Sequence, residues 1–428
     1  MAWSNQSKEF QELLAIGRPP NISRLFPNSK GLIVSGKFID RALIAKGKAM
    51  TIAANGRNHL VIRGVLRAAQ RADAAVIIEI AKSEGGASGY CAVNYWNMAR
   101  QVDAVLNELE IAVPVAVHAD HYAIKGEKDL IKAKVEVPTM FEAGITSIAI
   151  DASHLPDDQN LLSNIAINAS IPKWAGLETE VGEIKGDIGL SSAADALFQI
   201  QGLNAHNIFP DWIALNNGTT HGIQAASTGI HVDLTAEIHK AIAPYGVSGA
   251  QHGTSGNNSD RLREIAAKTR TTKANVATAL QMVSWGIEID DYGNALLKDN
   301  NLVKVPGKGM SEELWAEIQA VGKEKNFKAG DYKSLNLPFE SKILSQPVEI
   351  RERMIKAVED FVYNLLSEVF NATGTAHLVY EAIFKAKGYD PGVKAERIED
   401  PLNWSKEKIV EKAKSLNPDK GPKGNYDD

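Results

Sequence analysis

The sequence has a single cysteine, Cys91, among 428 residues, so no disulfide bond can form within the chain. Such usage is typical of a reducing compartment, and we expect a cytoplasmic location. The sequence also lacks an apolar run near the roughly 20 residues that span a bilayer, and its polar start lacks a secretion-signal pattern. The net charge of −5 gives no general attraction to nucleic acid or to acidic membranes. We therefore expect neither nucleic acid nor a membrane as a partner.

Strand-like apolar runs alternate with helical patterns from residue 46 to residue 300. This alternation predicts an α/β fold with eight strand–helix units, a (β/α)8 or TIM barrel. A doubly wound open sheet is the alternative. We expect the eight strands at residues 49–54, 74–80, 113–117, 147–150, 175–181, 212–215, 246–251 and 285–289.

Two further regions flank the predicted barrel. Residues 1–45 contain three prolines and are predicted to form an N-terminal arm with a helix. Residues 301–428 are predicted to form a C-terminal extension of loops and helices. Within it, residues 349–370 have apolar side chains at helical spacing, which is typical of an amphipathic helix.

Most of the chemically reactive side chains follow the predicted strands at their carboxyl ends, where barrels of this kind build their active sites. Imidazole and carboxylate groups are favoured zinc ligands. Glu178 and Glu180 lie two residues apart in one strand and therefore share a face, although a buried ion pair or a hydrogen-bonded pair is the alternative. The candidate metal ligands are His121, Glu178, Glu180, His221 and His252.

Two turns offer several backbone N–H groups to an anion. They are Ser83-Glu84-Gly85-Gly86 and Gly253-Thr254-Ser255-Gly256, and the second precedes a predicted helix that starts near Ser259. A helix N-terminus attracts phosphate, and glycine allows close approach of the backbone. Ordinary turn formation is the alternative explanation for both.

The order of these motifs resembles that of the class II, metal-dependent fructose-bisphosphate and tagatose-bisphosphate aldolases. The resemblance covers about residues 45–295 and, more loosely, 345–375. The motifs that carry it are His118-Ala119-Asp120-His121, Ile150-Asp151-Ala152-Ser153-His154-Leu155-Pro156, Leu177-Glu178-Thr179-Glu180-Val181-Gly182, Thr220-His221-Gly222 and His252-Gly253-Thr254-Ser255-Gly256.

The resemblance implies a lyase that cleaves a ketose phosphate reversibly. The leading substrate is the glycolytic intermediate fructose 1,6-bisphosphate, which yields glycerone phosphate and glyceraldehyde 3-phosphate. It also implies a homo-oligomer, a dimer or a tetramer. Zinc, or another divalent metal, would be held by His121, Glu180, His221 and His252, while Asp120 would handle the substrate hydroxyl proton. Phosphate and a possible potassium or sodium ion would contact Ser83, Gly222, Gly253 and Ser255.

The sequence departs from the family pattern in three places. Ile188 stands at the position of a catalytic glutamate, so Glu183 and Asp187 are the candidates to replace it. We expect the family motif Asn-Ile-Asp-Thr, which reads the substrate, to be replaced by Glu288-Ile289-Asp290-Asp291. The family's Asp-Pro-Arg, whose arginine holds the distal phosphate of a neighbouring subunit's substrate, reads Gln346-Pro347-Val348. The predicted substrate contacts are thus Asn55, at the end of the first strand, Glu288, Asp290 and Asp291.

These departures leave two alternatives open. The first is an aldolase or a retro-aldol C4 epimerase that acts on a different, less phosphorylated ketose. The second is a non-catalytic partner subunit that keeps the fold, although the retention of four metal-ligand residues and Asp120 argues against it.

Overall fold

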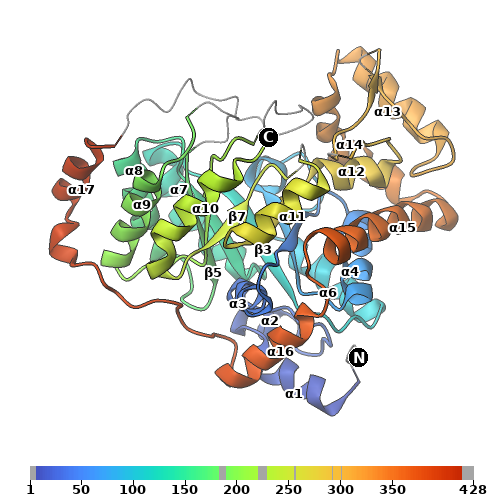
Figure 1. Ribbon diagram of the computed structural model, residues 1–428. Coiled ribbons are helices and arrows are strands. Elements are labelled where there is room, and N and C mark those ends of the chain that lie inside the picture. Colours follow the sequence, from blue (N-terminus) through green and yellow to red (C-terminus); the bar gives the residue numbers. More distant parts are fainter. Residues whose placement is uncertain are drawn as a thin grey trace.

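The computed structural model describes residues 6–182, 189–219, 229–254, 257–291, 293–299 and 301–416. Eight parallel strands pair in sequence order and close on themselves, so the predicted TIM barrel is confirmed (Figure 1). The strands are β1 Thr51–Asn55, β2 Val76–Ala81, β3 Val115–Ala123, β4 Ser147–Asp151, β5 Gly176–Val181, β6 Trp212–Leu215, β7 Ser248–Gln251 and β8 Thr271–Val276.

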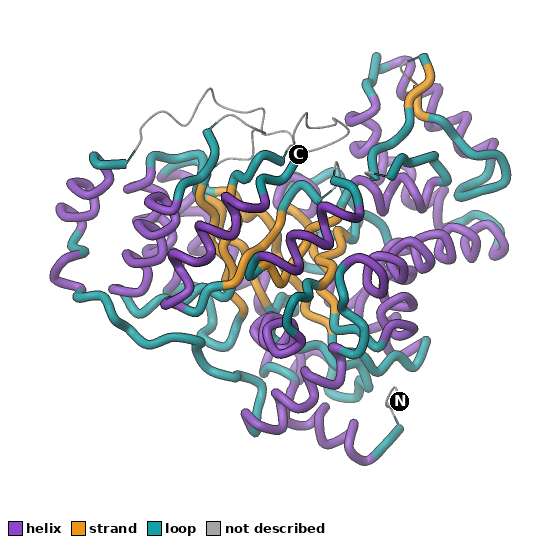
Figure 2. Tube along the Cα trace, in the orientation of Figure 1, coloured by secondary structure: helices purple, strands orange, loops and turns teal. Residues whose placement is uncertain are grey.

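Helices surround the strands on the outside, as the tube of Figure 2 shows. Strands β2 and β5 are buried along their whole length because side chains fill the barrel and helices cover it. The helices between the strands are α4 His59–Ala72, α5 Lys82–Gly85, α6 Met98–Glu108, α7 Glu127–Glu142, α8 Asp157–Asn168, α9 Ala193–Ala205, α10 Val232–Ile242 and α11 Ser259–Lys268.

The eighth strand differs from the prediction. It is the polar segment 271–276, and the predicted strand at 285–289 is wrong. The apolar residues there belong to the end of helix α12, Thr278–Trp285, and to a turn at Gly286, whose φ is 78°. Trp285 and Ile287 are buried against helices outside the barrel. They are apolar because they belong to a second hydrophobic core, and not because they form a barrel strand.

Residues beyond α12 build a lobe on one side of the barrel, where Figure 1 shows α13 and α14. The lobe has its own apolar core, to which Trp315 and Phe339 contribute. Helix α15 follows the lobe and packs against α4 and α12, which confirms the predicted amphipathic helix near 349–370. These elements are β9 Leu297–Lys298, β10 Asn301–Leu302, α13 Glu312–Glu324, a 3-10 helix Ala329–Leu335, α14 Asn336–Leu344, α15 Val348–Asn364 and a π-helical turn Leu365–Val369.

Both ends of the described chain pack on the barrel from outside. Helix α3 contacts α16, and a Cβ added at Gly36 would lie 2.7 Å from Ser147 of β4, so α3 lies directly against the strands. None of the described helices combines the length and the apolar content needed to cross a membrane. The remaining helices are α1 Lys8–Gly17, α2 Pro20–Leu25, α3 Gly36–Lys46, 3-10 helices Ala243–Tyr245 and Pro401–Asn403, α16 Thr375–Ala386 and α17 Lys406–Ala413.

Candidate active site

A β-bulge in β3 turns two consecutive side chains toward the mouth of the barrel. The pairing of β3 with β4 shifts register between Ala119 and Tyr122, and His121 adopts a left-handed φ of 41°. Neighbouring residues of a regular strand point to opposite faces. The bulge removes this alternation, so that Asp120 and His121 both contact residues from other strands.

His121 lies among three carboxylates. Its Nδ1 is 3.1 Å from Oε1 of Glu180 and 3.5 Å from Oδ2 of Asp151, and its Nε2 is 3.9 Å from Oδ2 of Asp120. Burial alone would lower the pKa of His121, but Glu180 and Asp120 outweigh burial and hold this pKa well above its usual value. The position therefore favours positive charge, whether from a proton or from a metal ion.

Glu180 lies between two imidazoles. Its Oε2 is 3.7 Å from Nδ1 of His252, and the ring centroids of His121 and His252 are 4.3 Å apart. Burial, reinforced by the nearby carboxylate of Asp151, raises the pKa of Glu180 to about 8. A carboxyl group in this state gains from a nearby cation, which would keep it ionised at neutral pH.

Both carboxylate oxygens of Glu178 contact other side chains. Oε1 lies 2.8 Å from Nε2 of His252, and Oε2 lies 2.9 Å from the ammonium of Lys273. Burial would raise the pKa of Glu178, but Lys273 and His252 outweigh it and lower this pKa to about 2. Because Nε2 of His252 faces Glu178, the opposite nitrogen, Nδ1, is directed toward Glu180.

Lys273 is fully buried at the centre of the barrel. Its ammonium lies 3.2 Å from Glu79, 3.4 Å from Asp120 and 2.9 Å from Glu178, on three different strands. Burial would lower the pKa of Lys273, but these carboxylates, Glu178 first, raise it above its usual value, so the lysine stays charged. One fixed positive charge thus stabilises the acidic centre of the barrel.

Asp120 accepts a hydrogen bond from the side-chain amide of Asn275, and the distance from Nδ2 to Oδ1 is 3.0 Å. Burial would raise the pKa of Asp120, but Lys273 and then His121 outweigh burial and hold this pKa well below its usual range. Asp120 is therefore an ionised hydrogen-bond acceptor at neutral pH, fixed by a lysine and an asparagine from β8.

The described ligands fit a divalent cation. Asp120, His121 and His252 place one donor atom each within 4.8 Å of one another, as do His121, Asp151 and Glu180, and also Glu178, Glu180 and His252. Nδ1 of His252 is buried and has no hydrogen-bond partner among the residues that the structure describes. A buried imidazole nitrogen without a hydrogen-bond partner, 3.7 Å from the carboxylate of Glu180, is the arrangement that a metal ion satisfies.

Two of the predicted phosphate residues, Ser83 and Gly253, are described, and both lie at the same end of the barrel. Ser83 is exposed in α5, directly after β2, and Gly253 follows β7 with a left-handed φ of 59°. Asn55 ends β1 and donates to Glu84, which also binds Arg57 through Nε at 2.7 Å. Glu84 fixes the turn that carries Ser83, while Asn55 is buried beneath it.

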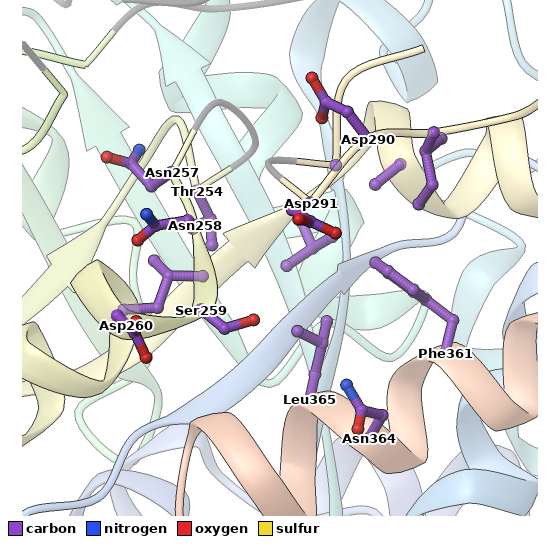
Figure 3. Close-up of a pocket in the computed structure, with 15 residues that line it drawn as sticks. Thr254, Asn257, Asn258, Ser259, Asp260, Asp290, Asp291, Phe361, Asn364 and Leu365 are labelled. Atoms are coloured by element: carbon purple, nitrogen blue, oxygen red, sulfur yellow. The ribbon is translucent and has the colours of Figure 1, made fainter. Parts of the chain in front are cut away.

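Glu288, Asp290 and Asp291 are not at the end of a barrel strand, because that end is formed by β8. They follow α12, and Glu288 is exposed while Asp290 accepts the backbone N–H of Asn294. Asp290 and Asp291 face the start of α11 across a pocket of about 500 Å3, as Figure 3 shows. None of the described metal candidates lines this pocket.

Five predicted site residues and the aligned Ile188 lie outside the described residues. The five are Glu183, Asp187, His221, Gly222 and Ser255. Their predicted roles stay predictions.

Three residues of the site, Lys273, Asn275 and Asp151, were not predicted from the sequence. Asp151 was visible at the end of a predicted strand. Lys273 and Asn275 lie in strand β8, Thr271–Val276, which begins shortly after helix α11 ends. Because helices and strands in such folds are joined by short connections, a strand could have been expected directly after this helix. With β8 in its place, the motif at its end is Asn275-Val276-Ala277-Thr278, which keeps the family's asparagine and threonine.

A closed parallel barrel with imidazoles and carboxylates at the carboxyl ends of its strands defines a barrel enzyme. A sequence profile of the family "Fructose-bisphosphate aldolase class-II" matches residues 39–326. The chain therefore belongs to the class II fructose-bisphosphate aldolase family, whose members are generally metal-dependent, and it is a carbon–carbon lyase of the aldolase class.

Individual relatives agree with this assignment. A fructose-bisphosphate aldolase of Streptococcus pneumoniae is 30% identical over 224 residues, which are 51% of this chain and 70% of that protein. Among solved structures, the YdjI aldolase of Escherichia coli K12 has a TM-score of 0.52 at 16% identity, covering 81% of this chain and all of that one. The fructose-bisphosphate aldolase of Campylobacter jejuni gives 0.51 at 18% identity, covering 81% and 97%. At such identities the structures show the fold alone.

Proposed function

We propose that this enzyme cleaves a ketose phosphate by a reversible retro-aldol reaction, with fructose 1,6-bisphosphate as the leading substrate. The observation that supports the proposal is that Glu180 lies between the imidazoles of His121 and His252 at one rim of the barrel, with the ionised Asp120 beside His121. The same rim carries Ser83 and Gly253, which suit a phosphate group. The products would be glycerone phosphate and glyceraldehyde 3-phosphate, and the setting glycolysis in the cytoplasm.

We assign zinc, or another divalent cation, to His121, Glu180 and His252, with His221 as the further ligand that the resemblance implies. When bound, the ion supplies Lewis-acid stabilisation of negative charge on the carbonyl oxygen of the ketose. Glu178 was predicted as a ligand as well, but its two oxygens face His252 and Lys273. We therefore give Glu178 the role of fixing the tautomer and the orientation of His252.

Asp120 accepts the proton of the hydroxyl group beside the carbon–carbon bond that breaks. Its carboxylate is nearly buried, and it is held by Lys273 and Asn275, so it is ionised and oriented before the substrate binds. A proton acceptor that is positioned in advance contributes roughly 10²- to 10⁴-fold to a rate. Lys273 is held in its charged form by three carboxylates, so it does not supply the neutral amine that a Schiff base requires.

A ketose without the distal phosphate is the second candidate substrate, and one observation favours it. Val348 stands where the family has the arginine for that phosphate. The nearby arginines are already engaged, since Arg353 donates to the carbonyls of Gly309 and Met310, and Arg351 donates to that of Gln346. By contrast, Asn275 and Thr278 support recognition of the other end of the substrate.

The test compares the zinc-loaded enzyme on fructose 1,6-bisphosphate, fructose 1-phosphate and unphosphorylated ketoses, with identification of the products. Cleavage of the bisphosphate with the highest kcat/KM supports the first candidate, and a preference for fructose 1-phosphate supports the second. His121→Ala should lose metal and activity together. Asp120→Asn should keep the metal and lose cleavage by about 10²-fold or more. Turnover at the wild-type rate in either variant would contradict the assigned roles.

A further inference from the structure

The side chain of Asn55, the last residue of β1, lies inside the barrel at its mouth. In the parallel sheet Asn55 is the register partner of Glu79 on β2. Residues paired in this way have side chains on the same face of the sheet. The carboxylate of Glu79 contacts the ammonium of Lys273 at the centre of the barrel, so that face is the interior. Asn55 is therefore directed inward, and it is buried.

The orientation of the Asn55 amide is set by Glu84. Nδ2 of Asn55 donates to Oε2 of Glu84. Because a carboxylate only accepts hydrogen bonds, the nitrogen of the amide must face it, and the oxygen must face the other way. This oxygen, Oδ1, is buried and has no hydrogen-bond partner in the part of the chain that the structure describes. A buried carbonyl oxygen in this state is stabilised when a donor reaches it.

Glu84 itself has donors on both of its oxygens. Oε1 accepts from Nε of Arg57 at 2.7 Å, lies 2.6 Å from Nη2 of the same residue, and accepts from the hydroxyl of Tyr90 at 3.2 Å. Oε2 accepts the backbone N–H of Ala81 at 3.2 Å as well as the amide of Asn55. These donors fill the roughly four acceptor positions of a carboxylate, so Glu84 has none left for a ligand.

Arg57 holds the carboxylate of Glu84 in place. Both side chains are buried, and a buried carboxylate requires a cation at this distance. Nη1 of Arg57 also donates to Oε1 of Gln281 at 2.8 Å, and Gln281 lies on α12, directly after β8. The pair thus joins the ends of β1 and β2 to α12 beside the amide of Asn55.

We propose that Glu84 and Arg57 are positioning residues that make Asn55 an acceptor for a hydroxyl group of the ketose. This inference rests on the proposed function and specifies which part of the substrate Asn55 contacts. The oxygens of an ionised phosphate only accept hydrogen bonds, so the amide oxygen of Asn55 would repel them. A sugar hydroxyl can donate to it. The phosphate contacts at this rim are left to Ser83 and Gly253.

The first experiment replaces Asn55 and varies the phosphates of the substrate. It measures kcat/KM of the zinc-loaded wild type and of Asn55→Ala on fructose 1,6-bisphosphate, fructose 1-phosphate and fructose 6-phosphate. Loss of a contact to a hydroxyl that all three share should lower kcat/KM by about tenfold on every ketose that the wild type cleaves. A loss confined to the substrates with one particular phosphate would overturn the proposal, because Asn55 would then contact that phosphate.

The matched control is Asn204→Ala. Asn204 is also a buried asparagine whose amide donates to a carbonyl oxygen, but it lies at the carboxyl end of α9. Barrel helices run antiparallel to their strands, so this end is opposite the mouth. The control should unfold at a lower urea concentration than the wild type and keep the wild-type kcat/KM. If the control loses as much kcat/KM as Asn55→Ala, the loss reports folding and the proposal fails.

A double-variant cycle separates positioning by Glu84 from a structural role. Glu84→Gln places an amide beside Asn55, which allows the Asn55 side chain to turn its nitrogen toward the substrate. This variant should lose about tenfold in kcat/KM, and the variant with both changes should also lose about tenfold, because Glu84 acts through Asn55. A loss of about a hundredfold, the product of two independent effects, would refute the positioning role.

The wild-type enzyme separates this inference from the proposal on which it rests. If the zinc-loaded wild type cleaves none of the three ketoses, the proposed function fails and the inference fails with it. If the wild type cleaves them and Asn55→Ala has the same kcat/KM, only the inference fails. The proposed retro-aldol function would then stand with the oxygen of Asn55 facing no part of the substrate.

Discussion

Replacing Lys273 by methionine should destabilise the metal-free protein severely. The change removes the one ammonium that faces Glu79, Asp120 and Glu178, all within 3.4 Å of it and buried. Breaking a buried ion pair from one side costs about 3–5 kcal/mol because the remaining charge is left uncompensated. Since a domain is typically stable by only about 5–15 kcal/mol, we expect a large fall in the denaturant midpoint.

The measurement is urea denaturation of the metal-free wild type and of three variants. Lys268→Met is the control, because Lys268 forms an ion pair with Glu264 on the surface. This variant should unfold at the same urea concentration as the wild type. The double variant Glu79→Gln/Lys273→Met should recover part of the loss, since one uncompensated carboxylate is removed. Lys273→Met should also bind zinc about 10- to 100-fold more weakly, because Glu178 no longer fixes His252. An unchanged midpoint for Lys273→Met would refute this account of the barrel centre.

Three further predictions concern the site and the lobe. Asn275→Ala removes the amide that orients Asp120, so kcat should fall by about tenfold while the metal content stays unchanged. Steady-state kinetics and metal analysis measure both quantities, and a wild-type kcat would contradict the role of Asn275. Burial raises the pKa of Glu340 to about 7. The folded state therefore gains stability from the protonated carboxyl group, and this gain is complete below about pH 4.5 and is lost as the pH rises through 7. Glu340→Gln should therefore unfold like the wild type at pH 4.5 but be more stable at pH 8, by up to about 3 kcal/mol, and equal stability at both pH values would contradict the shift. Removal of the metal by a chelator should lower the melting temperature. The free energy of unfolding should fall by about 2.7 kcal/mol relative to protein with metal at 100 times its Kd, and added zinc should restore it. A melting temperature that does not change when the chelator is added would argue against the metal site.

The position of the eighth strand shows where pattern reading succeeded and where it failed. Seven strands were predicted because they are apolar runs between helical patterns, and each forms close to its expected place. Strand β8 has the sequence Thr-Thr-Lys-Ala-Asn-Val, which carries no such signal. A lysine in the core of a barrel is stable only because Glu79, Asp120 and Glu178 surround it, and these partners lie on β2, β3 and β5. No local rule contains that information.

The predicted metal ligands stay a prediction, but their placement can be compared with the structure. His121, Glu180 and His252 were chosen by residue type and by position near strand ends, and in the structure Glu180 lies beside both imidazoles. Glu288, Asp290 and Asp291 were assigned to the substrate through the misplaced strand, and the structure places them beyond α12. The bulge that turns Asp120 and His121 the same way was not predictable, because it depends on how β3 pairs with β4.

The sequence alone determined the barrel and the face of it that carries the chemistry, because the alternation of apolar runs and the residues that end them are local properties. The tertiary structure alone decided which strand closes the barrel and which carboxylates can reach a metal ion. Both depend on one buried ammonium whose three partners are distant along the chain, and a charge in the core is stable only where the fold brings its partners to it.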